Sequence, residues 1–316
     1  MRWLVLSSVL ALFLVGTSPA RAADPGELKI GMLSGMFRDQ QPKVVEALSK
    51  PFRDLMTKHI GYNGDVEVVD DPMALCDRMK ENKVQLGVFH GFEFAWAQQR
   101  CDDLIPLIVT QPTGGTVQGI LVVNADCPAK GVADLKCDVL IPRGAKAHTL
   151  VFLDKLRDGV AVDVAKPAAK IDQTPEDVLN AVANGTAKAA LVDWAAFDGY
   201  KVLHPSAFKS LKVLTRSEEF PPAVVCYRKG TLTDDQATRI RDGMTASCKT
   251  PTGKMLMTLW NLKGFEAPPK GYQTSLDDIL KAYPVPKAEV KTNAKPEEKS
   301  VSDRVKTPAP KEPGGR

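Results

Sequence analysis

The amino-acid sequence predicts an α/β protein built around mainly parallel β-sheet. Short apolar runs of strand length alternate with longer segments whose apolar residues recur at helical spacing. Several of the helical segments begin with a capping residue followed by proline, which is typical of a helix start. The length of 316 residues suggests about two domains. The composition, 44% hydrophobic and 25% charged, excludes a wholly disordered or collagen-like chain.

In the first half, the first strand is expected at 28–33. A helix is expected over 42–59, because apolar residues stand there at 44, 45, 48, 52, 55 and 56. Asp71 and Pro72 then predict a capped helix start. The further strands of this half are expected at 65–69, 84–89, 104–109 and 118–124.

The second half repeats this alternation. TPED at 174–177 and TDDQ at 233–236 predict helix starts in which a threonine caps the first turn. Further helices are expected over 145–157 and 250–260. Strands are expected at 138–141, 189–192, 211–215 and 224–227. Alternating strands and helices imply βαβ units.

The N-terminus has the layout of a secretory signal peptide over residues 1–22. A positive start precedes an apolar run at 3–15, and A-R-A at 20–22 fits a cleavage site after Ala22. The alternative, a membrane anchor, requires about 20 apolar residues. We therefore expect a periplasmic or secreted protein.

Six cysteines follow the leader, and an even number in an exported chain favours disulfides. Connectivity cannot be deduced from spacing alone, and two alternatives are a zinc site and buried free thiols, the latter above all at Cys76. The expected pairs, best first, are Cys127–Cys137, Cys226–Cys248 and Cys76–Cys101.

The last segment, 284–316, is rich in proline, lysine, glutamate and threonine, and we expect it to be disordered. It is either a spacer or a tail that binds the cell wall or a partner. Residues 287–316 carry a net charge of +3, whereas the body over 23–286 carries −1. A nearly neutral body does not favour nucleic-acid binding.

Sequence signatures of catalysis and of phosphate or dinucleotide binding are missing, so we expect neither an enzyme nor a cofactor. Two segments instead suggest a ligand site. His90 follows a predicted buried strand, and ligands of α/β sheets bind beyond the strand ends. Arg143, Lys146 and His148 surround a predicted helix start, whose free N–H groups can hold an anion.

Four segments together resemble one family of solute-binding proteins. They are LKIGMLSG at 28–35, the helix-strand-helix pattern at 71–94, GTAKAALVDWAAF at 185–197 and FPPAVVCYRK at 220–229. In this order they are similar to the type 2 periplasmic solute-binding proteins of ABC transporters, in the phosphate, phosphite and phosphonate-binding (PhnD-like) family. The resemblance covers about 28–262.

The resemblance implies a two-lobed α/β fold with two crossover hinge strands and a ligand in the cleft. Lobe one would be 23–112 with 218–283, and lobe two 113–217. The crossovers would lie near 110–115 and 215–222, where the glycines of TGGT at 113–116 allow a hinge.

The resemblance also implies a ligand set. The family's hydroxyl-rich turn corresponds to 144–149, where only Thr149 carries a hydroxyl. Asp193 and Glu93 could accept a ligand amine, although Asp193 could equally cap the following helix. The implied ligand-binding residues are Met36, Phe37, His90, Gly91, Glu93, Arg143, Ala145, Lys146, His148, Asp193 and Phe220.

We therefore expect a monomeric receptor that delivers a small anion or zwitterion, of the phosphate or phosphonate type, to an ABC permease. The alternative is a sensory or scaffold module of the same fold without a transporter. A secreted enzyme is the third interpretation.

Overall fold

The computed structural model describes residues 26–37, 42–135, 137–159 and 173–286. The predicted signal peptide lies outside the described residues, as does the predicted tail apart from 284–286. The described residues up to Pro284 belong to one compact unit, and a second unit begins at Val285. Within the described residues, no helix combines the length and the apolar character needed to cross a membrane.

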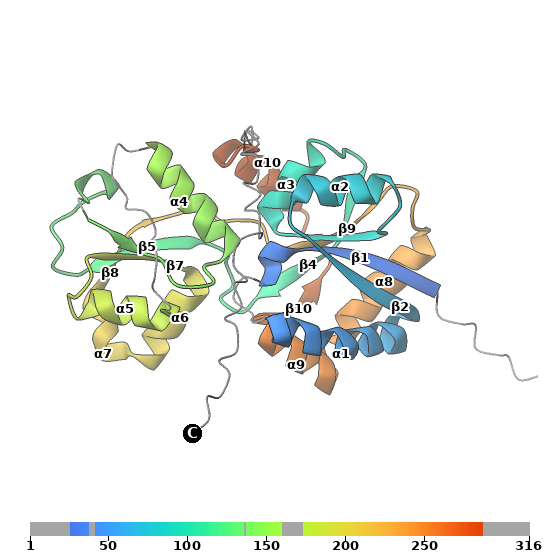
Figure 1. Ribbon diagram of the computed structural model, residues 1–316, viewed down its shortest axis with the longest axis horizontal. Coiled ribbons are helices and arrows are strands. Elements are labelled where there is room, and N and C mark those ends of the chain that lie inside the picture. Colours follow the sequence, from blue (N-terminus) through green and yellow to red (C-terminus); the bar gives the residue numbers. More distant parts are fainter. Residues whose placement is uncertain (1–25, 38–41, 136, 160–172, 287–316) are drawn as a thin grey trace, which may run out of the picture. The chain divides into compact units, whose positions relative to one another are not determined.

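Six strands form the larger sheet (Figure 1). Strands β2, β1 and β3 are parallel, whereas β9, β4 and β10 continue the sheet in antiparallel pairs. In spatial order the strands are β10 (Leu262–Glu266), β4 (Leu104–Pro112), β9 (Val224–Arg228), β3 (Leu86–Phe89), β1 (Gly26–Leu33) and β2 (Tyr62–Val69).

Four strands form the smaller sheet. Here β6 and β7 are parallel, and β5 pairs antiparallel with both β7 and β8. In spatial order the strands are β6 (Val139–Leu140), β7 (Ala189–Asp193), β5 (Gly119–Asn124) and β8 (Leu211–Arg216).

The expectation of mainly parallel sheet is therefore wrong, because both sheets are mixed. Among the described strands, three pairings are parallel and five are antiparallel. The reason is topological: the chain leaves the larger sheet after β4 and returns to it in β9, which lies between β3 and β4. A strand that returns to a sheet after a long intervening segment need not run parallel to its neighbours. The apolar runs that predict strands do not indicate the direction in which a strand runs.

The chain passes twice between the sheets, at 113–118 and 217–223. These two passes lie side by side, because Phe220 N–H donates to Val117 O at 2.9 Å and Ser217 N–H donates to Gly119 O at 2.9 Å. Gly115, in the first pass, has a φ of +79°, which L side chains rarely adopt.

Helices cover both faces of each sheet (Figure 1). The larger sheet has a core with α2, α3 and α10 on one face and a core with α1 and α8 on the other. Its helices are α1 (Pro42–Ile60), α2 (Pro72–Lys80), α3 (Gly91–Gln98), α8 (Asp234–Ser247), α9 (Pro251–Leu259) and α10 (Tyr272–Ala282). The smaller sheet packs with α4 (Ala147–Gly159), α5 (Pro175–Ala183), α6 (Trp194–Leu203) and α7 (Pro205–Phe208). The short turns η1 (Ser34–Phe37) and η2 (Val132–Asp134) complete the described elements.

The predicted helix caps are confirmed. The Asp71 carboxylate accepts from Ala74 N–H at 2.9 Å, and Thr174 and Thr233 accept from the third residue of their helices. The Asp177 and Gln236 side chains in turn accept from the threonine N–H groups, which completes two capping boxes.

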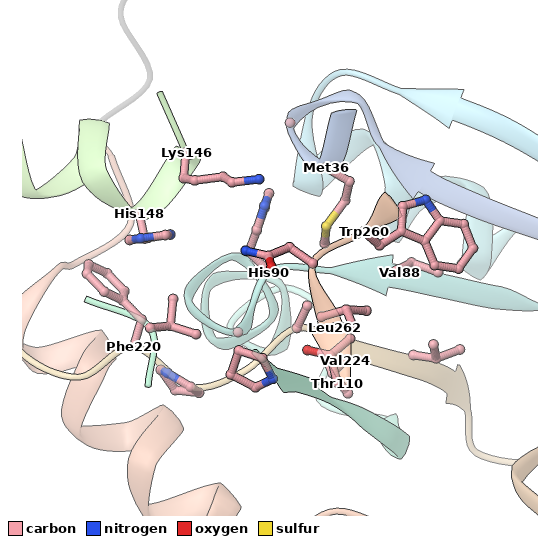
Figure 2. Close-up of a pocket in the computed structure, with 18 of the residues that line it drawn as sticks. Met36, Val88, His90, Thr110, Lys146, His148, Phe220, Val224, Trp260 and Leu262 are labelled. Atoms are coloured by element: carbon pink, nitrogen blue, oxygen red, sulfur yellow. The ribbon is translucent and has the colours of Figure 1, made fainter. Parts of the chain in front are cut away.

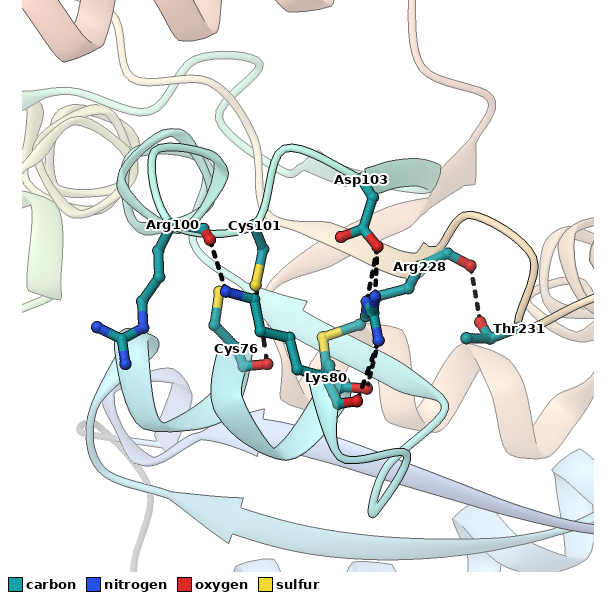
Figure 3. A network of polar contacts seen from close by, with 8 residues as sticks. Cys76, Lys80, Arg100, Cys101, Asp103, Arg228 and Thr231 are labelled. Carbon is teal, nitrogen blue, oxygen red and sulfur yellow. Dashed lines mark hydrogen bonds and ion pairs between the residues drawn. The ribbon is translucent and has the colours of Figure 1, made fainter.

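The cysteines are free thiols, so the expected disulfides are wrong. Cys76 and Cys101 are buried in the same core, but the Cys76 thiol donates to Ala97 O. The Cys101 thiol donates to Cys76 O (Figure 3). Cys226 lies in the core of the larger sheet with α2 and α3, whereas Cys248 packs with α9 in a different cluster.

Cys127 and Cys137 pack against one cluster of the smaller sheet and also remain free. Burial raises the pKa of the thiols of Cys76, Cys137, Cys226 and Cys248, which keeps them protonated and unreactive. No group of three metal-binding side chains is found within the described part of the chain.

Candidate functional site

A cavity of about 220 Å³ lies where the chain passes between the two sheets (Figure 2). Both passes line it, at Thr116, Val117 and Gln118 in the first and at Phe220 and Pro221 in the second. The larger sheet contributes the ends of β1 and β3, and the smaller sheet contributes the starts of α4 and α6. Each sheet therefore presents loops to the same space.

A second cavity, of about 540 Å³, adjoins the start of α4. Thr149, Gln173 and Thr174 line it together with the turn that leads into the helix. Lys146 and Asp193 line both cavities, so the two spaces meet at these residues.

Most of the residues expected to bind the ligand lie at these cavities. The first is lined by Met36, His90, Gly91, Lys146, His148, Asp193 and Phe220, and the second adds Arg143 and Ala145. Two of the expected ligand-binding residues are not among the described lining residues of either cavity. Glu93 is not among the described lining residues, and the side chain of Phe37 lies outside the described part of the structure.

The turn before α4 places the basic side chains. Gly144 has a φ of +68°, which allows the chain to reverse sharply between Arg143 and Ala145. Ala145 N–H donates to Pro142 O at 3.2 Å, and Arg143 N–H donates to Gln173 O at 2.9 Å. Thr149 N–H donates to Lys146 O at 3.0 Å, and the helix dipole favours a negative charge at this end of α4.

His148 lies in the first turn of α4 and is 7% exposed. Burial, together with smaller contributions from the nearby His90 and Lys146, lowers the pKa of its imidazole to about 3. The ring hydrogen-bonds to the backbone of Gln118, while Nε2 has no partner. At neutral pH His148 is therefore a neutral group with one unused hydrogen-bonding atom.

Other buried polar atoms near the cavities also lack partners. Of the five such side-chain atoms in the described residues, four belong to residues that line the two cavities. They are Thr116 Oγ1 and His148 Nε2 in the first and Thr149 Oγ1 and Gln173 Oε1 in the second. A buried polar group without a partner is costly, so this concentration is typical of a site that a polar ligand completes.

His90 and Glu93 form a pair at the start of α3. Glu93 Oε2 lies 2.6 Å from His90 Nδ1 and also accepts from His90 N–H at 3.3 Å. Both side chains are mostly buried, at 17% and 14% exposed. The helix turn brings residue i+3 back to the capping residue, so Glu93 orients His90, which itself lines the cavity.

Asp193 caps α6, because its carboxylate accepts from Ala196 N–H at 2.9 Å. Phe220 is 2% exposed and packs against three aromatic rings, at centroid distances of 5.6 Å to Phe92 and His148 and 4.8 Å to Tyr283. Phe220 therefore packs the second pass against α3, against the first turn of α4 and against Tyr283, which follows α10.

Sequence reasoning missed other lining residues, among them Thr116, Trp194 and Asn261. Asn261 follows α9 with a φ of +55° and lines both cavities. Its backbone and side-chain oxygens accept from the Thr113 hydroxyl in the first pass. Asparagine tolerates this conformation better than most residues. An asparagine just after a predicted helix was therefore the one sequence signal that could have indicated a turn at Asn261.

Two sheets of this topology, two passes and a cavity between them define the class of two-lobed periplasmic solute-binding proteins. The fold is similar to that of XAC2383 from Xanthomonas citri bound to a chloride ion, with a TM-score of 0.57, 18% identity and coverage of 80% of this chain and 95% of that chain. It is also similar to PhnD1 from Prochlorococcus marinus in complex with methylphosphonate, with a TM-score of 0.55, 14% identity and coverage of 82% and 98%.

A third similar structure is PA3383 from Pseudomonas aeruginosa, a binding protein component of an ABC phosphonate transporter. Its TM-score is 0.52 at 18% identity, with coverage of 81% of this chain and 86% of that chain. Residues 34–270 match the family model of the periplasmic substrate-binding proteins of ABC phosphonate transporters. The chain belongs to this family. Among curated protein sequences, no match was found.

Proposed function

We propose that this protein captures a small anion in the cavity between its sheets and delivers it to an ABC permease. The observation that carries the proposal is the concentration of unpartnered buried polar atoms in the residues that line the two cavities, which share Lys146. Hydroxyl and imidazole groups can hydrogen-bond an anion's oxygens, and the helix end and the ammonium group favour its charge.

The proposal includes a division of the chain into lobes. Lobe one is 23–112 with 218–283, lobe two is 113–217, and the mature chain begins after Ala22 and acts as a monomer. A ligand held by loops of both lobes binds the closed arrangement better than the open one, and so shifts the equilibrium towards closure.

The family model describes a transporter component rather than an enzyme. It favours uptake over a sensory or scaffold role. One of the similar structures is a complex with methylphosphonate, which makes a phosphonate or phosphate the first ligand to test.

A thermal-shift screen with phosphate, methylphosphonate, sulfate, alkyl sulfonates and amino acids tests the proposal. A ligand at a hundredfold excess over its Kd stabilises the folded state by about 2.7 kcal/mol. An anion should raise the Tm, whereas a screen in which no anion does so contradicts the proposal.

The Lys146→Glu variant tests whether the anion binds at the start of α4. It should weaken binding at least about tenfold, because a charge-assisted hydrogen bond is lost and repulsion is added. Lys209→Glu is the matched control, because Lys209 is exposed and lies between α7 and β8 of the smaller sheet. This variant should bind the anion as the wild type does. Equal affinity of Lys146→Glu and the control would remove the α4 start from the site.

A further inference from the structure

We propose that the ligand is an amphiphilic organic anion, whose charged head binds at the start of α4 and whose alkyl or aryl group enters an apolar chamber beside the larger sheet. This inference rests on the proposed function, because the head is the anion described above. It adds the chemical class of the rest of the molecule.

The charge in the first cavity is confined to one part of it. Among the described lining residues, the ionisable side chains are His90, Lys146, His148 and Asp193. All four lie at the ends of strands or the starts of helices where the sheets face each other. The lining residues that lie between the larger sheet and α1, α8 or α9 include no ionisable side chain. A charged group would therefore be poorly solvated in that part of the cavity.

We define the apolar chamber by six lining residues that share two properties. Each is only half-buried, although each packs against a hydrophobic core cluster between the larger sheet and α1, α8 or α9. The residues are Met32, Phe52, Val88, Trp260, Leu262 and Phe265. The Phe52 and Trp260 rings meet edge to face, with centroids 6.1 Å apart.

Apolar side chains that face a core are normally covered completely, since close packing stabilises the folded state. Here the cavity runs between them and leaves part of their surface without a protein contact. Burying that surface against a ligand's apolar group would be favourable by the same hydrophobic effect that stabilises the core.

The size of the space sets the size of the group. An apolar cavity of about 150 Å³ holds benzene. The cavity of about 220 Å³ therefore accommodates a single ring or a short alkyl chain together with part of the head.

The chamber and the polar end are continuous. In Figure 2, Lys146 and His148 lie on one side, Val88 and Trp260 on the other, and His90 and Met36 between them. A ligand with its oxygens at Lys146 would project its substituent past Met36 towards Val88.

Calorimetric titration of the intact protein with methylphosphonate, hexylphosphonate and phenylphosphonate tests the inference. Each buried methylene adds about fourfold in affinity, so hexylphosphonate should bind at least about tenfold more tightly than methylphosphonate. Equal affinities across the series would overturn the inference and leave the anion site intact. Failure of all three to bind, where phosphate or sulfate does bind, would overturn the inference alone, and failure of every anion would overturn the proposed function as well.

Variants that fill the chamber give an independent readout. Val88→Phe should abolish the preference for hexylphosphonate over methylphosphonate, because the larger side chain fills the chamber. Val68→Phe, at a position on β2 that is 49% exposed, is the matched control. Should Val88→Phe fail to fold by circular dichroism, Leu262→Phe narrows the chamber from β10. A preference for the longer chain that persists in the folded chamber variants would overturn the inference.

Discussion

His148 is a buried histidine with a pKa near 3, held neutral because the surrounding protein cannot solvate the charged ring. In the unfolded chain its pKa is about 6.5. As the pH falls below that value, the unfolded state takes up a proton that the folded state does not, until the pH approaches 3. The stability from this group is therefore complete above the unfolded pKa and is lost as the pH falls.

Denaturant unfolding at pH 7.5 and pH 5 measures this loss. The wild type should lose about 2 kcal/mol through His148 between these values, a loss that the His148→Gln variant lacks. The comparison uses the change with pH within each variant, so a different stability at pH 7.5 does not affect it. An equally steep loss in both variants would contradict the burial of a neutral His148.

Residue-level chemistry of this kind was partly predictable. Basic residues around a predicted helix start indicated an anion site at 143–148, and Arg143, Lys146 and His148 line the two cavities. The pKa of His148 and the unused oxygen of Thr116 were not predictable, because both depend on burial by elements distant in the sequence.

Helix α3 approaches the second pass so closely that Gly91 has no room for a side chain. A Cβ at Gly91 would lie 2.2 Å from Pro221 O, a backbone atom that cannot rotate away. We expect Gly91→Ala to lower the free energy of unfolding by about 1–3 kcal/mol. It should also weaken ligand binding, because His90 moves with the helix start.

Gly199→Ala is the control for this prediction. Gly199 lies within α6, and a Cβ there meets nothing within 4 Å. Alanine should stabilise that helix by roughly 0.5–1 kcal/mol. Denaturant midpoints that fall for Gly199→Ala, or that stay unchanged for Gly91→Ala, would contradict the packing described.

Arg228 connects β9 to the end of α2 (Figure 3). Its Nε and Nη2 donate to Asp103 Oδ2 at 2.8 and 2.6 Å, and Nη1 donates to Lys80 O at 3.1 Å. Both charged side chains are mostly buried, and the Arg228 guanidinium lowers the pKa of the Asp103 carboxyl.

Arg228→Met should therefore lower the free energy of unfolding by about 2 kcal/mol, since it leaves Asp103 and a helix carbonyl without their donor. Lys229→Met changes the neighbouring exposed lysine and should stay within about 0.5 kcal/mol of wild type. Urea unfolding of the two variants tests this, and equal stabilities would show that the Arg228 contacts contribute nothing.

At the scale of elements, the sequence predicted those features that depend on residues close together in the chain. The capped helix starts at Asp71, Thr174 and Thr233 were predicted because a cap and its partner lie within four residues. Strand β10 and helix α10 were not predicted. The β10 sequence LKGFE has no continuous apolar run, and its place at the sheet edge comes from pairing with β4, about 150 residues earlier.

At the scale of the molecule, the two mixed sheets and two adjacent passes surround one cavity with residues from both sides. The two-lobed fold was predicted through the ordered family segments, whereas the sheets' strand directions and the free thiols were not. Both of these depend on which distant strands become neighbours. Cys226, for example, faces the core that contains α2, while Cys248 lies with α9.

A crystal structure of the protein with methylphosphonate would show whether the anion binds at the start of α4. We expect the phosphonate oxygens within hydrogen-bonding distance of Lys146 Nζ and of at least one of His148 Nε2 and Thr149 Oγ1, with both sheets' loops around the ligand. A bound ligand that touches none of these atoms, or that contacts only one of the two sheets, would contradict this expectation.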